Sequence, residues 1–312
     1  MVGPLDTVSA VTLYGSDSRR IIDEVFAAVS DIDMRMSAIS QDSELARISA
    51  GAGGPVAVSS DVFALVEEAL AISAETNGAF DPTIRPVATL WDLGSGNERI
   101  PSDNEIAEAM SKIGYARVTL DKTTRGVSLD SLGMALDLGG IAKGYACDTA
   151  VAILKKNGAR RGIIDLGGNI YAYGTKLGGK PWVVGVRTPI PGENGYFCTL
   201  NVSDKAVVTS GAYERFFEKD GRRYHHIFDP STGRPADNGL LSVTIVASSA
   251  TVADALSTAC FVMGAERGRA FLAERRDAEG IFVTEGMDVL LSPGLLGQVE
   301  IADGRFRLAG EK

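Results

Sequence analysis

The tetrapeptide Asp-Leu-Gly-Gly occurs twice in this chain, at residues 137–140 and again at residues 165–168. Glycine adopts backbone conformations that are closed to other residues, and it lets the main chain pass close to a neighbouring group. The first copy precedes a helical pattern from about Lys143 to Lys156, which Asn157-Gly158 ends. The second copy interrupts a β-rich stretch at 162–173. Two sharp turns on either side of one helix therefore constrain the path of the middle of the chain.

The rest of the sequence mixes helical and β patterns without strict alternation. Apolar spacing predicts helices at 17–38, 60–76, 102–112 and 250–263, and strands at 7–14, 116–120, 126–130, 181–187, 197–202, 205–209 and 241–248. Ser102 and Glu105 have the spacing of a capping box. A strand–turn–strand is predicted around Asp220-Gly221, and 92–103 reads as a loop. This pattern favours an α+β fold with mixed, largely antiparallel sheets and flanking helices, rather than a doubly wound sheet. We expect a single domain over residues 1–312.

Charge and composition exclude several classes of function. The chain of 312 residues has a net charge of −9, and its basic residues run no longer than pairs, so we expect no nucleic-acid partner. Its three cysteines lack CxxC spacing, which argues against a metal cluster or a redox pair, and Cys147 and Cys260 read as buried thiols. The sequence predicts no transmembrane segment, and no signal peptide opens it. Location stays open: periplasmic or membrane-anchored if a leader segment was removed, otherwise cytoplasmic.

The first Gly-rich turn could bind an anion. It reads Asp137-Leu-Gly-Gly-Ile-Ala-Lys143, and the start of the following helix offers unpaired N–H groups beside the Lys143 ammonium. An acidic chain that binds a pyrophosphate must cancel the charge locally with such groups or with a cation. A tight strand-to-helix turn with a solvated lysine explains the same residues equally well. The pattern is not GxGxxG, so it does not indicate a Rossmann dinucleotide fold.

Both histidines of the chain, His225 and His226, precede the turn that begins at Asp229. Adjacent residues of a strand face opposite ways, so only one ring can enter a site. A histidine near a carboxylate is a frequent general base. The alternative is a surface histidine that packs on Tyr213 or Tyr224.

Asp254 and Thr258 are four residues apart on an otherwise apolar helical pattern, so they share one face. A buried carboxylate needs a partner, and a hard cation with oxygen ligands is a suitable one. The alternative is that Asp254 caps the helix and Thr258 bonds back to its own turn. A weaker signal comes from Asn77–Trp91, where a polar turn lies beside aromatic residues.

Taken together, these motifs resemble the FAD:protein FMN transferase family, also called the ApbE or thiamine-biosynthesis lipoprotein family. The resemblance covers nearly the whole chain and follows seven segments in order: Ser37–Leu45, Asn77–Trp91, Asp137–Asp148, Asp165–Ile170, Thr209–Gly211, His226–Pro235 and Ser242–Gly264. It implies an ApbE-like, T-fold-like architecture.

The resemblance also implies roles for particular residues. Mg²⁺ would be bound by the side chains of Asp254 and Thr258 and by the backbone carbonyl of Gly140, with Ser257 a less secure ligand. His226 would be the base that deprotonates the acceptor hydroxyl. The flavin nucleotide would be lined by the remaining residues of the site: Ile39, Ala79, Phe80, Asp81, Asp137, Lys143 and Ile227. Ile39 departs from the aromatic residue with which many members cover the flavin ring.

The activity that the resemblance implies is magnesium-dependent transfer of FMN from FAD to a Thr or Ser hydroxyl of an acceptor flavoprotein subunit, with release of AMP. A cation, Lys143 and backbone N–H groups would spread the negative charge of the transferring phosphoryl group. Two alternatives stay open. One is an FAD pyrophosphatase that hydrolyses FAD to FMN and AMP, and the other is an FAD-binding protein without turnover.

Overall fold

The computed structural model describes residues 5, 7–14, 18–51 and 53–309, and these residues form two compact units. The first unit consists of Met1–Asp31, Lys143–Tyr213 and Asn238–Lys312, and the second consists of Ile32–Ala142 and Glu214–Asp237. The chain passes from the first unit to the second within helix α1 (Ser18–Met36). The expectation of a single domain stays a prediction.

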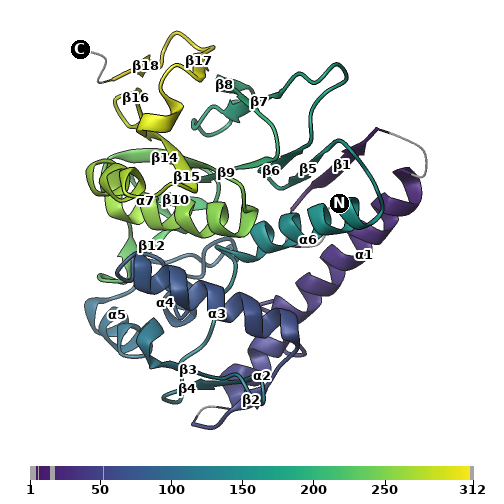
Figure 1. The fold of residues 1–312 in the computed structure, drawn as a ribbon. Helices are drawn as coiled ribbons and strands as arrows, with labels where there is room; N and C mark the ends of the chain where they lie inside the picture. Colours follow the sequence, from purple (N-terminus) through teal and green to yellow (C-terminus); the bar gives the residue numbers. More distant parts are fainter. Residues whose placement is uncertain (1–4, 6, 15–17, 52, 310–312) are drawn as a thin grey trace. The chain divides into compact units, whose positions relative to one another are not determined.

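An eight-stranded sheet is the framework of the first unit (Figure 1). Its strands follow the order β1-β5-β6-β9-β14-β15-β16-β18 and pair antiparallel, except that β16 and β18 run parallel. The strands are β1 (Ser9–Leu13), β5 (Gly162–Leu166), β6 (Asn169–Tyr173), β9 (Lys205–Gly211), β14 (Leu240–Ala247), β15 (Ala278–Thr284), β16 (Asp288–Leu291) and β18 (Arg307–Leu308). Gly167 and Gly168, both with positive φ, make the turn from β5 to β6.

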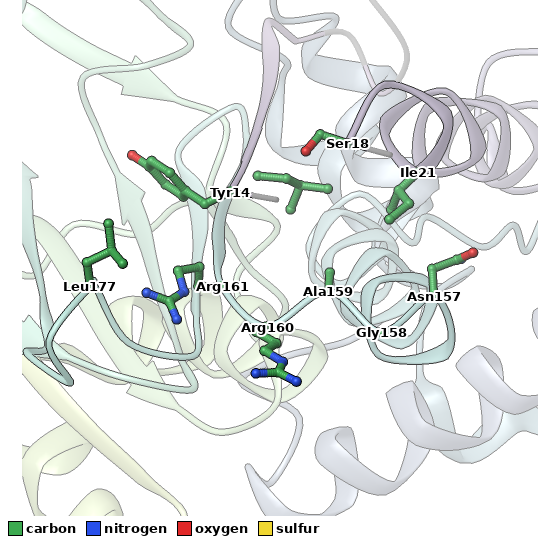
Figure 2. A pocket seen from close by; sticks show the side chains of 10 residues that line it. Tyr14, Ser18, Ile21, Asn157, Gly158, Ala159, Arg160, Arg161 and Leu177 are labelled. Atoms are coloured by element: carbon green, nitrogen blue, oxygen red, sulfur yellow. The ribbon is translucent and has the colours of Figure 1, made fainter. Parts of the chain in front are cut away.

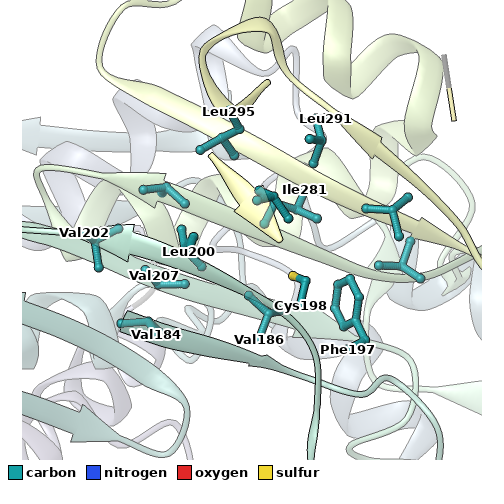
Figure 3. Packing of buried hydrophobic residues seen from close by; sticks show 14 of the residues in the cluster. Val184, Val186, Phe197, Cys198, Leu200, Val202, Val207, Ile281, Leu291 and Leu295 are labelled. Carbon is teal, nitrogen blue, oxygen red and sulfur yellow. The ribbon is translucent and has the colours of Figure 1, made fainter. Parts of the chain in front are cut away.

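One face of this sheet packs on a smaller antiparallel sheet of order β17-β8-β7, which comprises β17 (Val299–Ile301), β8 (Tyr196–Val202) and β7 (Trp182–Arg187). Their shared core contains Phe197, Leu200 and Val207, and Ile281 contributes from β15 (Figure 3). The next residue of β15, Phe282, points to the other face, where it contacts Gly268. Because successive side chains of a strand face opposite ways, β15 contributes apolar side chains both to the core with the small sheet and to the face covered by helix α7 (Ala250–Ala273).

Helices α6 (Ala142–Lys156) and α7 (Ala250–Ala273) contribute to the first unit, and α7 packs on β9, β14 and β15. Gly264 has φ 81° and ψ 170°, so α7 is broken there. The side chain of Asn238 donates to the carbonyl of Phe261 at 2.6 Å and satisfies a group near the break. The sequence predicted a helix that stops at 263, whereas the chain resumes a helix after this single glycine.

Near its N-terminal end, each of the two helices carries a carboxylate that accepts hydrogen bonds from the start of the other helix. Asp148 of α6 accepts from the hydroxyl of Ser249 and the amide of Ala250, at 2.8 and 2.9 Å, and from the amide and hydroxyl of Thr251, at 2.9 and 2.7 Å. Asp254 of α7 in turn accepts from the amide of Gly144 at 2.8 Å. Each carboxylate therefore satisfies N–H groups that the other helix leaves unpaired at its start.

In its described residues, the second unit combines four helices with three small sheets. Its helices are α2 (Glu44–Ala50), α3 (Ser60–Glu75), α4 (Arg85–Trp91) and α5 (Asp103–Met110), and the 3₁₀ turn η2 covers Tyr115–Arg117. Its sheets are β2-β4-β3, formed by Val56–Ala57, Gly126–Leu129 and Val118–Asp121; β10-β11, formed by Phe216–Lys219 and Arg222–His225; and β12-β13, formed by Phe228–Asp229 and Arg234–Pro235. The predicted capping box of Ser102 and Glu105 is present. A core cluster of Val87, Trp91, Ile106, Ala109, Ile113 and Phe228 packs α4, α5 and β12 together.

The predicted α+β class with largely antiparallel sheets is confirmed. None of the helices in the described ranges combines the length and apolar character that crossing a bilayer requires. The three cysteines are buried, and burial raises their thiol pKa values, to about 12 for Cys198 and Cys260.

We expect Asp148→Ala to lower the free energy of unfolding by about 2–3 kcal/mol, because it removes a helix cap and leaves several donors unsatisfied. Urea unfolding of the full chain measures this. Asp23→Ala is the control: among the described residues Asp23 forms an exposed pair with Arg19 on α1, so its loss should cost less than about 0.5 kcal/mol. Equal effects of the two substitutions would contradict the role of Asp148.

Candidate functional site

The predicted cation ligands of the first unit lie on the buried face of α7. Asp254 is 3 % exposed, and besides the Gly144 amide its carboxylate has the Lys143 ammonium 3.9 Å from Oδ1. This arrangement requires glycine at position 144, because a Cβ there would lie 2.2 Å from the carbonyl oxygen of Ala250. The close contact of α6 with α7 thus brings the start of α6 to the carboxylate.

Hydroxyl groups extend the polar cluster along the same helix. The Ser257 hydroxyl donates to the backbone carbonyl of Asp254 at 2.8 Å. The hydroxyl of Ser210, on β9, lies 2.7 Å from that of Ser257 and 3.2 Å from that of Thr258. Asp254 does not cap α7, because Ser249 is the N-cap residue. The carboxylate of Asp254 and the hydroxyls of Ser257 and Thr258 therefore share one part of the unit.

This donor set suits Mg²⁺, which prefers hard oxygen ligands and typically takes one or two carboxylates, with substrate phosphates and water completing its shell. Nowhere in the described part of the chain do three or more His, Cys, Asp or Glu side chains converge on one point. A site for a transition metal or a structural zinc ion would need such a cluster. The oxygens of Asp254, Ser257 and Thr258 are of the kind that fits Mg²⁺ instead.

In the second unit, the loop after α3 is tied together by Asp81. Its Oδ1 accepts from the amide and hydroxyl of Thr83 at 2.8 and 2.6 Å, and its Oδ2 accepts from the amide of Tyr115 at 2.9 Å. Burial raises the pKa of Asp81, although these hydrogen bonds oppose the shift. The carboxylate thus fixes the loop that carries Ala79 and Phe80, of which Ala79 is half-buried and Phe80 is buried.

The first Gly-rich turn joins this loop, because the amide of Asp137 donates to the carbonyl of Pro82 at 2.7 Å. The Asp137 carboxylate accepts from the amide of Gly139 at 2.8 Å and lies 3.5 Å from the guanidinium of Arg85. Gly140 follows in the turn and is half-buried. Arg85 is a cation that the sequence argument did not single out, because a lone arginine before a proline carries no recognisable pattern.

His225 is a buried structural residue. Its Nδ1 accepts from the amide of Ile227 at 3.3 Å, so in the neutral ring Nε2 carries the proton and donates to the carbonyl of Ala236 at 2.9 Å. Burial lowers the pKa of this ring. His225, at the end of β11, therefore belongs to the buried interior of the second unit.

His226 is half-buried, and its ring has the opposite tautomer. Its Nδ1 lies 3.3 Å from the carbonyl oxygen of Arg215, which can only accept, so the neutral ring has its lone pair on Nε2. Asp229, a possible partner in the sequence, instead accepts from the amide and hydroxyl of Ser231 within its own turn. Ile227 follows His226 and is buried.

Position 39, which the resemblance assigns to the flavin ring, carries an exposed aliphatic side chain, since Ile39 is 67 % exposed. Two aromatic residues of the matched motifs, Trp91 and Phe228, pack on each other with ring centroids 5.9 Å apart in the core of the second unit. The indole N–H of Trp91 donates to the carbonyl of Gly233. These two rings are therefore committed to packing and are not substitutes for an aromatic residue at position 39.

The structure thus groups the predicted residues in two sets. Asp254, Ser257, Thr258 and Lys143 lie together in the first unit, where Ser210 joins them. The second unit contains Ile39, Ala79, Phe80, Asp81, Asp137, Gly140, His226 and Ile227, and in it the Gly-rich turn contacts the loop after α3. Ser210 lies in a matched motif. Only the packing of α7 on β9 shows that its hydroxyl faces those of Ser257 and Thr258.

An α+β fold of this kind, in which a buried carboxylate and hydroxyl groups of one helix lie beside a lysine, defines a protein whose first unit is suited to phosphate-group chemistry. The chain belongs to the ApbE family, which it matches over residues 5–282. It is 39 % identical to the FAD:protein FMN transferase of Treponema pallidum, over 97 % of this chain and 89 % of that protein. The relative of that name from Klebsiella pneumoniae is 36 % identical, over 90 % and 87 %.

Solved structures agree with this assignment. The ApbE protein of Thermotoga maritima superimposes with a TM-score of 0.88 and 36 % identity, covering 95 % of this chain and 96 % of that one. The flavin transferase ApbE from Vibrio cholerae has a TM-score of 0.79 at 30 % identity and covers 88 % of this chain and 89 % of its own. The family that the sequence motifs resemble is therefore confirmed.

We expect His225 to make stability depend on pH. Its folded pKa lies below the ordinary 6.5, so between those two values the unfolded chain binds more protons than the folded chain. The free energy of unfolding should therefore fall as the pH is lowered through 6.5, and it should level off below the folded pKa. Urea midpoints at about pH 7.5 and about pH 5.5 measure the change.

In His225→Asn this part of the pH dependence should disappear, whereas His226→Asn should keep it and serves as the control. If His225→Asn retains the full dependence of the wild type, His225 is not the group responsible.

Proposed function

We propose that this chain transfers FMN from FAD to a Thr or Ser hydroxyl of an acceptor flavoprotein subunit, in a reaction that requires Mg²⁺ and releases AMP. The observation that carries the proposal is the buried Asp254, which shares its helix with the hydroxyls of Ser257 and Thr258 and has the Lys143 ammonium beside it. Relatives named FAD:protein FMN transferase support the flavin-transfer part of this proposal.

The reaction breaks the bond between the FMN phosphorus and the bridging oxygen of FAD and forms a bond from that phosphorus to the acceptor oxygen. AMP leaves with the bridging oxygen. Bound Mg²⁺ would neutralise part of the negative charge on the pyrophosphate. Gly140 would contribute its backbone carbonyl to the ion, together with Asp254 and Thr258 and, less securely, Ser257.

The other residues of the site bind the nucleotide and move the proton. Lys143 adds a cation that stabilises the charge of the transferring group. His226 takes the proton of the acceptor hydroxyl on Nε2, and the Arg215 carbonyl fixes its ring through Nδ1. We assign Ile39, Ala79, Phe80, Asp81, Asp137 and Ile227 to the flavin-nucleotide wall. Within it Asp81 positions the loop through its internal hydrogen bonds, and Arg85 supports the Gly-rich turn through Asp137.

A second function, FAD hydrolysis to FMN and AMP, is favoured by one observation. Ile39 is exposed and aliphatic, and Trp91 and Phe228 are committed to the core. Phe80, the aromatic residue assigned to the wall, is itself buried. A ring face of the flavin that is covered by Ile39 would therefore lack the stacking attraction of an aromatic ring, about 0.5–1.5 kcal/mol. Water would then have better access to the pyrophosphate than under an aromatic cover.

One assay separates these functions. The protein is incubated with FAD and Mg²⁺, with and without a peptide that carries a Thr acceptor motif, and AMP and flavinylated peptide are quantified. Release of AMP only with the peptide, in equal amount to flavinylated peptide, supports the transferase. Release without the peptide supports the hydrolase, and retention of intact FAD in both arms would leave only a binding function.

We expect Asp254→Asn to reduce Mg²⁺-dependent turnover by about a hundredfold or more, because a bound metal supplies several kcal/mol of charge stabilisation. The amide oxygen of Asn can still accept from Gly144, so the fold should survive. Calorimetric titration of Mg²⁺ measures binding directly, and Asp23→Asn on the exposed surface is the charge-matched control. Wild-type Mg²⁺ affinity in Asp254→Asn would rule out the ligand role.

We expect His226→Asn to slow FMN transfer by about 10²–10⁴-fold, the usual contribution of a general base. Its affinity for FAD, measured by flavin fluorescence quenching, should stay close to that of the wild type. His225→Asn is the matched control and should affect stability more than turnover, because both of its ring nitrogens serve the core. A turnover defect confined to His225→Asn would show that the base has been assigned to the wrong histidine.

A further inference from the structure

A cavity of about 450 Å³ lies in the first unit, at the end of α6 that is remote from Lys143 (Figure 2). Its walls come from the end of β1, the first turns of α1, the segment that follows α6, and the loop between β6 and β7. Lys143 and Lys156 stand about 20 Å apart along α6 at 1.5 Å per residue, so this cavity is separate from the Asp254 cluster. Its volume falls in the range of small-molecule sites.

Two neighbouring arginines line this cavity, Arg160 and Arg161. Within the described residues, neither guanidinium forms an ion pair, because Glu24, whose carboxylate accepts from the lining residue Asn157, pairs with Arg20 and Lys156 instead. Nη1 of Arg161 is buried and has no hydrogen-bond partner there. A buried charged donor without an acceptor is unfavourable, and an anion in the cavity would satisfy it once the guanidinium turns toward that anion.

The backbone that carries these arginines is fixed by its neighbours. The hydroxyl of Tyr173 donates to the carbonyl of Ala159 at 3.0 Å, and the amide of Tyr14 donates to the carbonyl of Arg161 at 3.4 Å. Gly174, with φ 62°, lies so close to the carbonyl of Arg160 that a Cβ would be 2.2 Å from that oxygen. The two guanidinium groups therefore extend from a preorganised segment, which lowers the cost of binding.

The rest of the lining is apolar or aromatic. Leu13 and Ile21 contribute aliphatic surface, Leu177 lies 79 % exposed at the rim, and the ring of Tyr14 packs on Trp182 with centroids 5.9 Å apart. Two adjacent cations suit the dianionic charge and several acceptor oxygens of a phosphate better than a single carboxylate. The apolar walls suit a hydrocarbon or aromatic group attached to it.

We propose that this cavity binds a phosphate group that carries an apolar or aromatic substituent, with Arg160 and Arg161 on the phosphate and Leu13, Ile21 and Tyr14 against the substituent. The phosphate could belong to a soluble ester or to the headgroup of a phospholipid, and the chemistry of recognition is the same for both. The site goes beyond the proposed flavin transfer, and its occupation can be measured without turnover.

The test uses the full chain and phenyl phosphate as the soluble probe, titrated by calorimetry. We expect saturable binding to the wild type and a loss of affinity of about tenfold or more in Arg160→Gln/Arg161→Gln, since hydrogen bonds to charged groups are removed. Arg267→Gln/Arg276→Gln removes two exposed arginines of the same unit and should bind like the wild type. Arg161→Lys keeps the charge but not the planar fork, and should bind with intermediate affinity.

A second arm identifies the source of the phosphate. Phosphatidylcholine vesicles with and without phosphatidic acid are sedimented with the wild type and with Arg160→Gln/Arg161→Gln. Retention that needs both phosphatidic acid and the two arginines assigns the site to lipid headgroups. Phenyl phosphate binding without vesicle retention assigns it to soluble esters. The proposal is overturned if the wild type binds neither probe, if the double variant binds like the wild type, or if the control variant loses binding equally.

Discussion

The exchange of carboxylates between α6 and α7 is the interaction on which the first unit depends. Asp148 accepts four hydrogen bonds from the start of α7, and Asp254 accepts one from the start of α6. The exchange works only because Gly144 lets the two helices meet at backbone distance. The contact of Gly144, which has no side chain, with the backbone of Ala250 therefore sets the separation of the helices. It also sets the position of the carboxylate assigned to Mg²⁺.

This arrangement gives Asp254 two tasks that support each other. Its carboxylate accepts from the Gly144 amide at the start of α6, and this hydrogen bond holds it in one orientation. As a proposed ligand it needs that orientation before any ion arrives. Preorganised groups bind and catalyse at lower cost than groups that must be ordered first. The hydroxyl of Ser210 acts in the same sense, since it contacts Ser257 and Thr258 from the sheet beneath.

Local signals in the sequence predicted most elements of the fold. Periodicity found the long helices, and the Ser102 capping box marked the start of α5. Asn157-Gly158 and Gly167-Gly168 marked two of the turns. The same signals ended α7 too early, because nothing local shows that Asn238 compensates for the break at Gly264. Asp148, Ser210 and Arg85 were likewise missed as structural partners. Their importance comes from residues far away in the chain, and one sequence does not show those contacts.

The order of segments along the chain has a consequence for folding during synthesis. Every residue of the second unit has left the ribosome once Asp237 emerges. At that moment the first unit still lacks β14, which pairs with both β9 and β15, and it lacks the whole of α7. Its eight-stranded sheet is complete only when strands more than half the chain apart, such as β1 and β15, have both been synthesised. The residues proposed to line the nucleotide can therefore fold early and locally, whereas the Asp254 cluster forms among the last parts of the molecule, after slow long-range pairing.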